Sequence, residues 1–161
     1  MSIRNGKMKA MERKIRMIVK AVLFDRRVVL PGFLLLAVVF LDFLFLHPII
    51  SELDVLEHFL FGFVLSESAS KSTSAAGLDK RLTGRLNKRS VRQADLLIRL
   101  LGFLLIGGLL WESCERFLFP MFGAAYDSFF TLPITLHNID GAVDVTVGIL
   151  GCITAWYTEK F

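Results

Sequence analysis

The stretch ELDVLEHFLFGFVL (residues 52–65) places ionisable side chains at the start of an apolar run. These side chains are Glu52, Asp54, Glu57 and His58. A helix that crosses a membrane needs roughly 20 mainly apolar residues, so this stretch reaches that length only if its polar flanks are included. The stretch therefore raises two questions: whether it spans a membrane, and why its acidic residues lie at its start.

The remaining apolar runs of the chain, residues 28–46, 96–111 and 141–157, suggest how the first question is answered. Hydrophobic residues make up 54% of the sequence and the mean hydropathy is +0.58, which is high for a soluble domain. We predict an all-α fold, a four-helix transmembrane bundle with basic cytoplasmic amphipathic segments. The alternative is a soluble, strongly apolar helical bundle, which is disfavoured because the runs have polar ends but almost no polar face.

The predicted domain organisation has two parts. Residues 1–27 form a basic amphipathic N-terminal segment, in which apolar side chains recur at helical spacing: Met8, Met11, Ile15, Ile18 and Val22. Such a helix can lie on an anionic leaflet, although a disordered tail is the alternative for the first ten residues. Residues 28–161 form the transmembrane domain, with helices at about 28–47, 51–67, 94–115 and 139–158, a cytoplasmic loop at 68–93 and an outer loop at 116–138.

The uneven distribution of Lys and Arg predicts the orientation. Basic residues are concentrated before residue 28 and between residues 71 and 92, whereas the connections expected outside carry only Arg116. The positive-inside rule then places both termini in the cytoplasm of a multi-pass protein of the cell membrane. Arg99, near the inner end of the third helix, can snorkel to the interface. Trp111 and Tyr126 are expected to anchor the outer interface.

The inner loop is expected to divide in two. The segment SESASKSTSAAG (residues 66–77) has the composition of a flexible connection, and the basic segment at residues 78–95 is expected to form a second surface helix. The basic residues are therefore interpreted as determinants of topology that bind anionic lipids through the N-terminus and residues 78–92. They are not interpreted as a nucleic-acid interface.

Topology brings carboxylates from every predicted helix to the same outer layer, and nothing comparable is expected at the inner ends. Residues three or four apart on a helix share a face, as in the pairs that Asp54 forms with Glu57 and His58. Gly148, Cys152 and Ala155 continue the Asp144 face, and small residues mark the packed side of a membrane helix. The predicted polar site comprises Asp54, Glu57, His58, Glu112, Glu115, Asp140 and Asp144, with Asp42 and His47 as secondary candidates.

The negative charge of acids in a membrane must be neutralised or paired, since inserting one Asp at the centre of a membrane helix costs roughly 2.5–3.5 kcal/mol. Protonation, Arg116, protonated His58 or a bound divalent cation could supply it. The proposed metal ligands are His58, Asp54, Glu112, Glu115 and Asp144, because carboxylate and imidazole groups suit such an ion. Alternatively, the acids are separate interfacial residues or helix caps, which explains Glu52 well but not the acids at the end of the third helix.

Three segments in this order resemble the VanZ-like and YjdF-like small polytopic membrane proteins. LDVLEHFLFGFVLSE (residues 53–67) resembles their Asp-x-x-x-His-Phe opening, WESCERF (111–117) their Glu-x-x-Glu segment, and NIDGAVDVTVGILG (138–151) their Asp-x-x-x-Asp helix. The resemblance covers about residues 28–157 and carries over Asp54, His58, Glu112, Glu115, Asp140 and Asp144. It departs from the family at residues 141–143, where a Gln or Asn is usual, and in the basic loop at 66–95. One branch of this family is linked to glycopeptide resistance, which implies a role in the cell envelope.

Three functional hypotheses follow. The first is that the outer site binds a cation, a proton or a polar lipid or envelope ligand. The second is a metal-dependent membrane enzyme that acts on a lipid-linked substrate, with its catalytic residues unassigned. The third is an accessory subunit of a larger membrane complex, with a second copy or another membrane protein as the partner.

Overall fold

The computed structural model describes residues 2–41, 52–111, 113 and 134–159. This part of the chain is all helical and contains no strand, so the predicted fold class is confirmed at that level. The elements are α1 (Ser2–Leu23), α2 (Arg26–Leu41), α3 (Glu52–Ala75), α4 (Leu78–Thr83), α5 (Lys88–Phe103), the π-helical segment η2 (Leu104–Trp111) and α7 (Ile134–Thr158).

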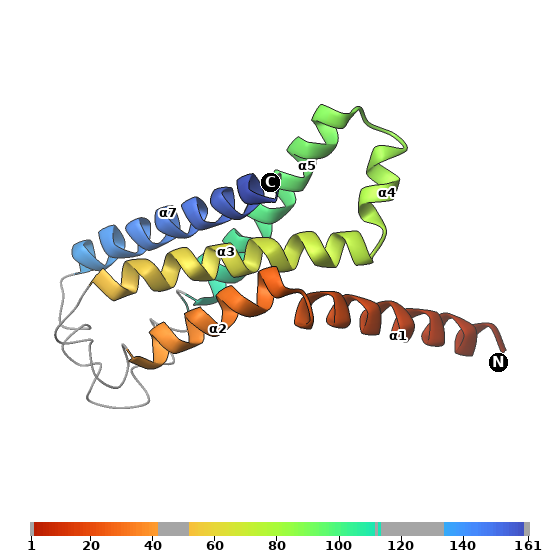
Figure 1. The fold of residues 1–161 in the computed structure, drawn as a ribbon, viewed down its shortest axis with the longest axis horizontal. Coiled ribbons are helices and arrows are strands. Elements are labelled where there is room, and N and C mark those ends of the chain that lie inside the picture. Colours follow the sequence, from red (N-terminus) through yellow and green to blue (C-terminus); the bar gives the residue numbers. More distant parts are fainter. Residues whose placement is uncertain (1, 42–51, 112, 114–133, 160–161) are drawn as a thin grey trace.

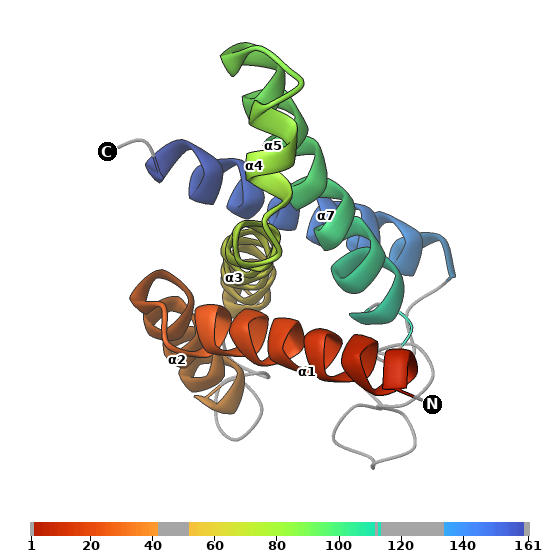
Figure 2. The ribbon, with the colours of Figure 1, turned by 90° about the vertical axis from the view of Figure 1, so that its right-hand side faces the viewer.

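Helix α3 is the central element of the fold. It packs most extensively against α7 and also contacts α1, α2 and α5 (Figure 1). When the molecule is viewed along α3, the other helices surround it (Figure 2). The stretch that begins at Glu52 therefore forms the first half of the helix on which the others assemble.

Small residues allow α3 and α7 to approach closely. A Cβ atom on Gly62 of α3 would overlap the backbone of Gly148, and one on Gly151 would overlap the carbonyl of Phe59. The thiol of Cys152 donates a hydrogen bond to the Gly62 carbonyl at 3.1 Å. Close backbone contact through small residues is the usual packing mode of membrane helices.

The buried face of α7 confirms one prediction. Asp144, Gly148, Cys152 and Ala155 are all buried, as expected of residues that recur at steps of three or four along one helical stripe. This face points toward α3, and it therefore aligns Asp144 with the first turns of that helix.

The corner between α1 and α2 is attached to α3 through Asp25. Its carboxylate accepts a hydrogen bond from the backbone amide of Arg27 at 2.9 Å and pairs with Lys71 Nζ at 3.1 Å. Burial alone would raise the pKa of Asp25, but the contacts with Arg27 and Lys71 outweigh it and hold that pKa below the usual 3.8. The charged form of Asp25 is thus the one that these contacts stabilise.

The structure differs from the expected loop at residues 68–93. Helix α3 continues through the Ser-rich segment to Ala75, and Gly77, at a φ of 71°, makes the turn into α4. Helix α5 begins at Lys88, where the side chain of Asn87 accepts a hydrogen bond from the Ser90 amide at 2.9 Å. Composition indicated a flexible connection, but packing against α7 and α5 stabilises a helix there.

The other predicted boundaries are met only in part. Helix α2 is described from Arg26 to Leu41, so residues 42–47 of the first predicted helix lie outside the description. Helix α7 begins at Ile134, before the expected start at 139, and residues 116–133 of the expected outer loop are not described. By length and composition, one helix in the described ranges is suited to crossing a membrane, α7 over Gly141–Thr158.

Candidate functional site

The predicted polar site is described for three side chains. Glu57, His58 and Asp144 are in this group. Asp54 and Asp140 lie in α3 and α7, but only their backbone is described. The remaining predicted residues fall outside the described part of the chain: Glu112, Glu115, Asp42, His47, Arg116 and Tyr126.

His58 and Asp144 come together across the α3–α7 interface. His58 Nε2 lies 3.7 Å from Asp144 Oδ2, and each residue is only 5% exposed. His58 lies four residues before Gly62 in α3, and Asp144 lies four residues before Gly148 in α7. One helical turn therefore separates the close contact of Gly62 with the Gly148 backbone from this pair.

The neighbouring acids belong to the same region by backbone position. Asp54 precedes His58 by one helical turn, and Asp140 precedes Asp144 by one turn, so each shares a face with a member of the pair. Glu57 is partly buried, with its Oε1 atom shielded from solvent. Among the described side chains, no group of three or more His, Cys, Asp or Glu residues is arranged to hold a metal ion. The metal set proposed from the sequence is thus described only for His58 and Asp144.

A buried His–Asp pair has a chemistry of its own. The imidazole is neutral or cationic according to its proton, and the carboxylate at 3.7 Å interacts differently with the two forms. The protonation of the two groups is therefore coupled. The pair can therefore take up or release a proton.

A second polar cluster lies on the other half of the same interface, around Arg99. Its side chain is fully buried, and its Nε donates a hydrogen bond to Asp95 Oδ2 at 2.9 Å. Its Nη1 donates to Ser66 Oγ at 3.3 Å and lies 3.6 Å from Glu67 Oε1. Its Nη2 pairs with Glu159 Oε2. One guanidinium thus connects α3, α5 and the residue that follows α7.

This Arg99 cluster corrects two expectations. The sequence allowed Arg99 to snorkel, but its side chain is buried among helices. The helix ends near Glu67 and Asp95 were expected to carry nothing comparable to the other acids, and that prediction is wrong. The sequence did contain a signal, because Asp95 and Arg99 are four apart in the predicted third helix and Glu67 ends the predicted second one. An acid one turn before a basic residue gives that residue an intrahelical partner, which allows it to turn inward.

Glu67 depends on Arg99 more than the other acids do. It is fully buried, and neither carboxylate oxygen makes a hydrogen bond in the described structure. Its compensation is the ion pair with Arg99. A buried carboxylate in this position requires its cation, since an uncompensated buried charge is strongly unfavourable.

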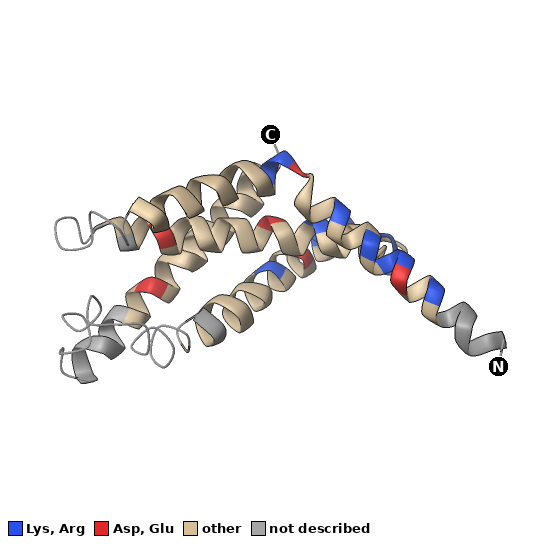
Figure 3. Ribbon diagram, turned by 90° about the horizontal axis from the view of Figure 1, so that it is seen from below, with Lys and Arg blue, Asp and Glu red and all other residues tan. Residues whose placement is uncertain are grey.

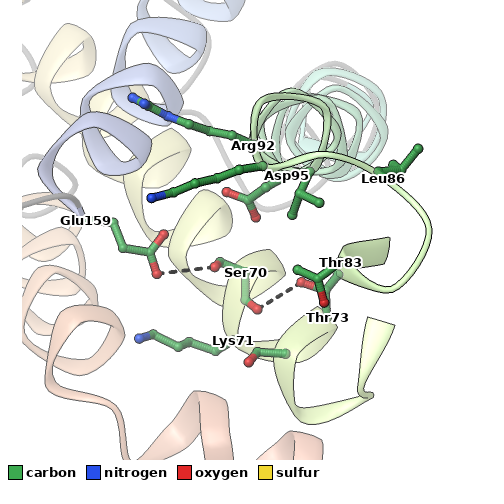
Figure 4. Close-up of a pocket in the computed structure, with 11 residues that line it drawn as sticks. Ser70, Lys71, Thr73, Thr83, Leu86, Arg92, Asp95 and Glu159 are labelled. Atoms are coloured by element: carbon green, nitrogen blue, oxygen red, sulfur yellow. Dashed lines mark hydrogen bonds between the residues drawn. The ribbon is translucent and has the colours of Figure 1, made fainter. Parts of the chain in front are cut away.

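A pocket of about 560 Å³ adjoins the Arg99 cluster, between the end of α3, α4, the start of α5 and the end of α7 (Figure 4). Ser70 donates a hydrogen bond to Glu159 Oε1 at 3.5 Å across this pocket. The guanidinium of Arg92 lies 4.8 Å from the ring centroid of Trp156. The sequence did not predict this pocket, because most of its lining comes from residues 68–93, which were expected to form a loop.

Comparison of the chain with protein-family models, with curated proteins and with solved structures finds no match. The resemblance to VanZ-like and YjdF-like proteins therefore stays a prediction, carried by the residues of the sequence alone.

Proposed function

We propose that the chain is an integral membrane protein whose helical segments cross the bilayer as a bundle, and that its His58–Asp144 pair binds a proton or a small cation. The cytoplasm lies on the side of the basic segments. The pair then occupies the outer half of the α3–α7 interface, and the Arg99 cluster occupies the inner half.

The observation that carries this proposal is an inverted distribution of polarity. The largest fully buried side chains are Arg99, Phe103, Glu67, Cys152 and Ser66. The exposed side chains include many large apolar ones, among them Leu30, Phe33, Leu34, Leu36, Phe40, Leu97, Leu101, Leu105, Leu150 and Ile153. Water disfavours large apolar side chains exposed in this number, whereas a bilayer favours apolar side chains outside and polar, small side chains between helices.

The distribution of charge supports the orientation. Lys and Arg, blue in Figure 3, lie on α1 and toward the end of the molecule that carries the C-terminus. The described ribbon at the opposite end carries acidic segments and no basic ones (Figure 3). By the positive-inside rule the basic end faces the cytoplasm, which places the start of α3 toward the outside.

Binding rather than packing alone is favoured by the position of the pair. Ionisable side chains inside a membrane are costly and commonly mark ion or proton sites. A buried imidazole and a carboxylate 3.7 Å apart can share a proton or hold a small cation between them.

Asp144→Asn is expected to change how His58 takes up a proton, because it replaces the carboxylate that lies 3.7 Å from the imidazole with a neutral amide. The measurement is imidazole ¹⁵N NMR on protein in lipid nanodiscs. A His47→Gln, His137→Gln background leaves His58 as the single histidine of the chain.

Thr146→Val is the control for this experiment, since Thr146 is an exposed residue of α7 whose hydroxyl bonds within its own helix. A cation ligand would move the same His58 resonance at fixed pH, whereas a proton site would not respond to the added cation. A midpoint that is equal in wild-type protein and in Asp144→Asn would show that the pair is only structural.

A further inference from the structure

We propose that the pocket beside the Arg99 cluster binds a phosphate group, carried by the headgroup of an anionic phospholipid of the cytoplasmic leaflet. The lipid as the source rests on the membrane orientation proposed above. A soluble phosphate ester has the same chemistry, and the experiment below distinguishes the two sources.

Basic side chains converge on this pocket from two helices. Lys71 of α3 and Lys88 and Arg92 of α5 contribute to its lining. In the view of Figure 4, Lys71 and Arg92 lie on either side of Glu159. Cations on separate helices can surround a phosphate from several directions, and charge-assisted hydrogen bonds to phosphate are among the strongest in proteins.

The pocket also contains two carboxylates on the side of the Arg99 cluster. Asp95 and Glu159 both line it, and both pair with Arg99, which is buried behind them. Each of these carboxylates has one oxygen on the side of Arg99, Oδ2 of Asp95 and Oε2 of Glu159. Lys71 pairs with Asp25, so Lys88 and Arg92 are the cations of the lining that the proposal assigns to the phosphate.

The lining also suits the rest of a headgroup. Ser70, Thr73, Ser74 and Thr83 contribute hydroxyl groups, and Leu86 and Val91 contribute apolar surface. The N-terminus of α5 begins at the pocket, and the positive end of a helix dipole favours an anion. The volume of about 560 Å³ is in the range of small-molecule sites, so a glycerol phosphate headgroup fits it.

The test compares two double variants with the same change in net charge. Lys88→Gln with Arg92→Gln removes cations that line the pocket. Arg85→Gln with Arg89→Gln removes cations of the same basic segment that are exposed and do not line it. Binding of dioctanoyl phosphatidylglycerol to the purified full-length protein in a neutral detergent is measured by isothermal titration calorimetry. Circular dichroism and gel filtration establish that both variants are folded.

The pocket variant is expected to bind phosphatidylglycerol about tenfold or more weakly, and the matched variant within about threefold of wild type, because salt screens exposed cations that lie away from the bound phosphate. An equal loss in both variants would overturn the proposal. Equal binding of dioctanoylglycerol, which lacks the phosphate, would also overturn it.

Competition by free glycerol phosphate identifies a soluble ester as a ligand of the pocket, and its failure to compete identifies the lipid. The membrane proposal is tested separately by lipid exposure of the outer helix faces. A chain that is embedded in the bilayer but shows equal losses in the two variants refutes only the pocket.

Discussion

Arg99→Met is expected to destabilise the folded protein by about 3–5 kcal/mol, the usual cost of removing one partner from a buried ion pair. The substitution keeps most of the side-chain volume but leaves Glu67 buried without its cation, and it removes the cation that Asp95 and Glu159 share. Unfolding of the detergent-solubilised protein, followed by circular dichroism in increasing denaturant, measures this loss.

A matched control and a rescue make the result specific to the buried network. Arg89→Met changes an exposed residue of the same helix α5 and is expected to change stability by less than about 0.5 kcal/mol. Adding Glu67→Gln to Arg99→Met removes the buried carboxylate that has lost its cation. The double variant is therefore expected to recover part of the lost stability. A loss in Arg99→Met as small as that in Arg89→Met would contradict the role assigned to the cluster.

Gly62→Ala is expected to destabilise the protein by roughly 1–3 kcal/mol, the range for overpacking a tight interior. Its new methyl group would meet the backbone of Gly148, which cannot move aside as a flexible side chain can. The helices α3 and α7 would separate, and the hydrogen bond from Cys152 to the Gly62 carbonyl would lengthen. The same denaturant titration measures the effect.

Gly32→Ala provides the opposite expectation from the same chemical change. Gly32 lies in α2, and a Cβ atom there would have nothing within 4 Å. The substitution is therefore expected to stabilise the protein by roughly 0.5–1 kcal/mol, because Ala loses less conformational entropy than Gly when the helix folds. Equal effects at the two positions would contradict the close contact of α3 with α7.

The periodicity of the sequence predicted features that belong to a single helix and do not depend on how helices pack together. The face that runs from Asp144 to Ala155 followed from spacing and residue size, and it is buried as expected. The sequence also placed His58 and Asp144 in the same layer, because charge topology orders the helix ends. Their contact across the interface requires the register of α3 against α7, which Gly62 and Gly148 set through close packing.

The Arg99 cluster could not be predicted in the same way, because it depends on how three helices converge. Charge counting assigns each basic residue to topology, and it does not distinguish Arg89, which is exposed, from Arg99, which is buried. Likewise, the Ser-rich segment after Glu67 has a poor helix propensity. The contacts of Ser66 with Cys152 and of Ser70 with Glu159 exist only once α3 lies against α7.

Polar contacts run along the α3–α7 interface beside the Arg99 cluster. The Cys152 thiol donates to the Gly62 carbonyl, and Ser66 Oγ both donates to the Cys152 carbonyl and accepts from Arg99. The sequence predicted nothing comparable there, because each of these contacts depends on how α3, α5 and α7 pack together.

The central claim is that this bundle is surrounded by lipid, and spin-label accessibility tests it most directly. Nitroxides attached at Phe33→Cys, Leu101→Cys and Leu150→Cys occupy exposed apolar positions on α2, α5 and α7. A Cys114→Ser background leaves Cys152, whose thiol is fully buried, as the native cysteine. In protein reconstituted into liposomes, we expect all three labels to collide more often with oxygen than with a water-soluble nickel chelate. More frequent collisions with the nickel chelate at these positions would show that the faces are in water and would contradict the account.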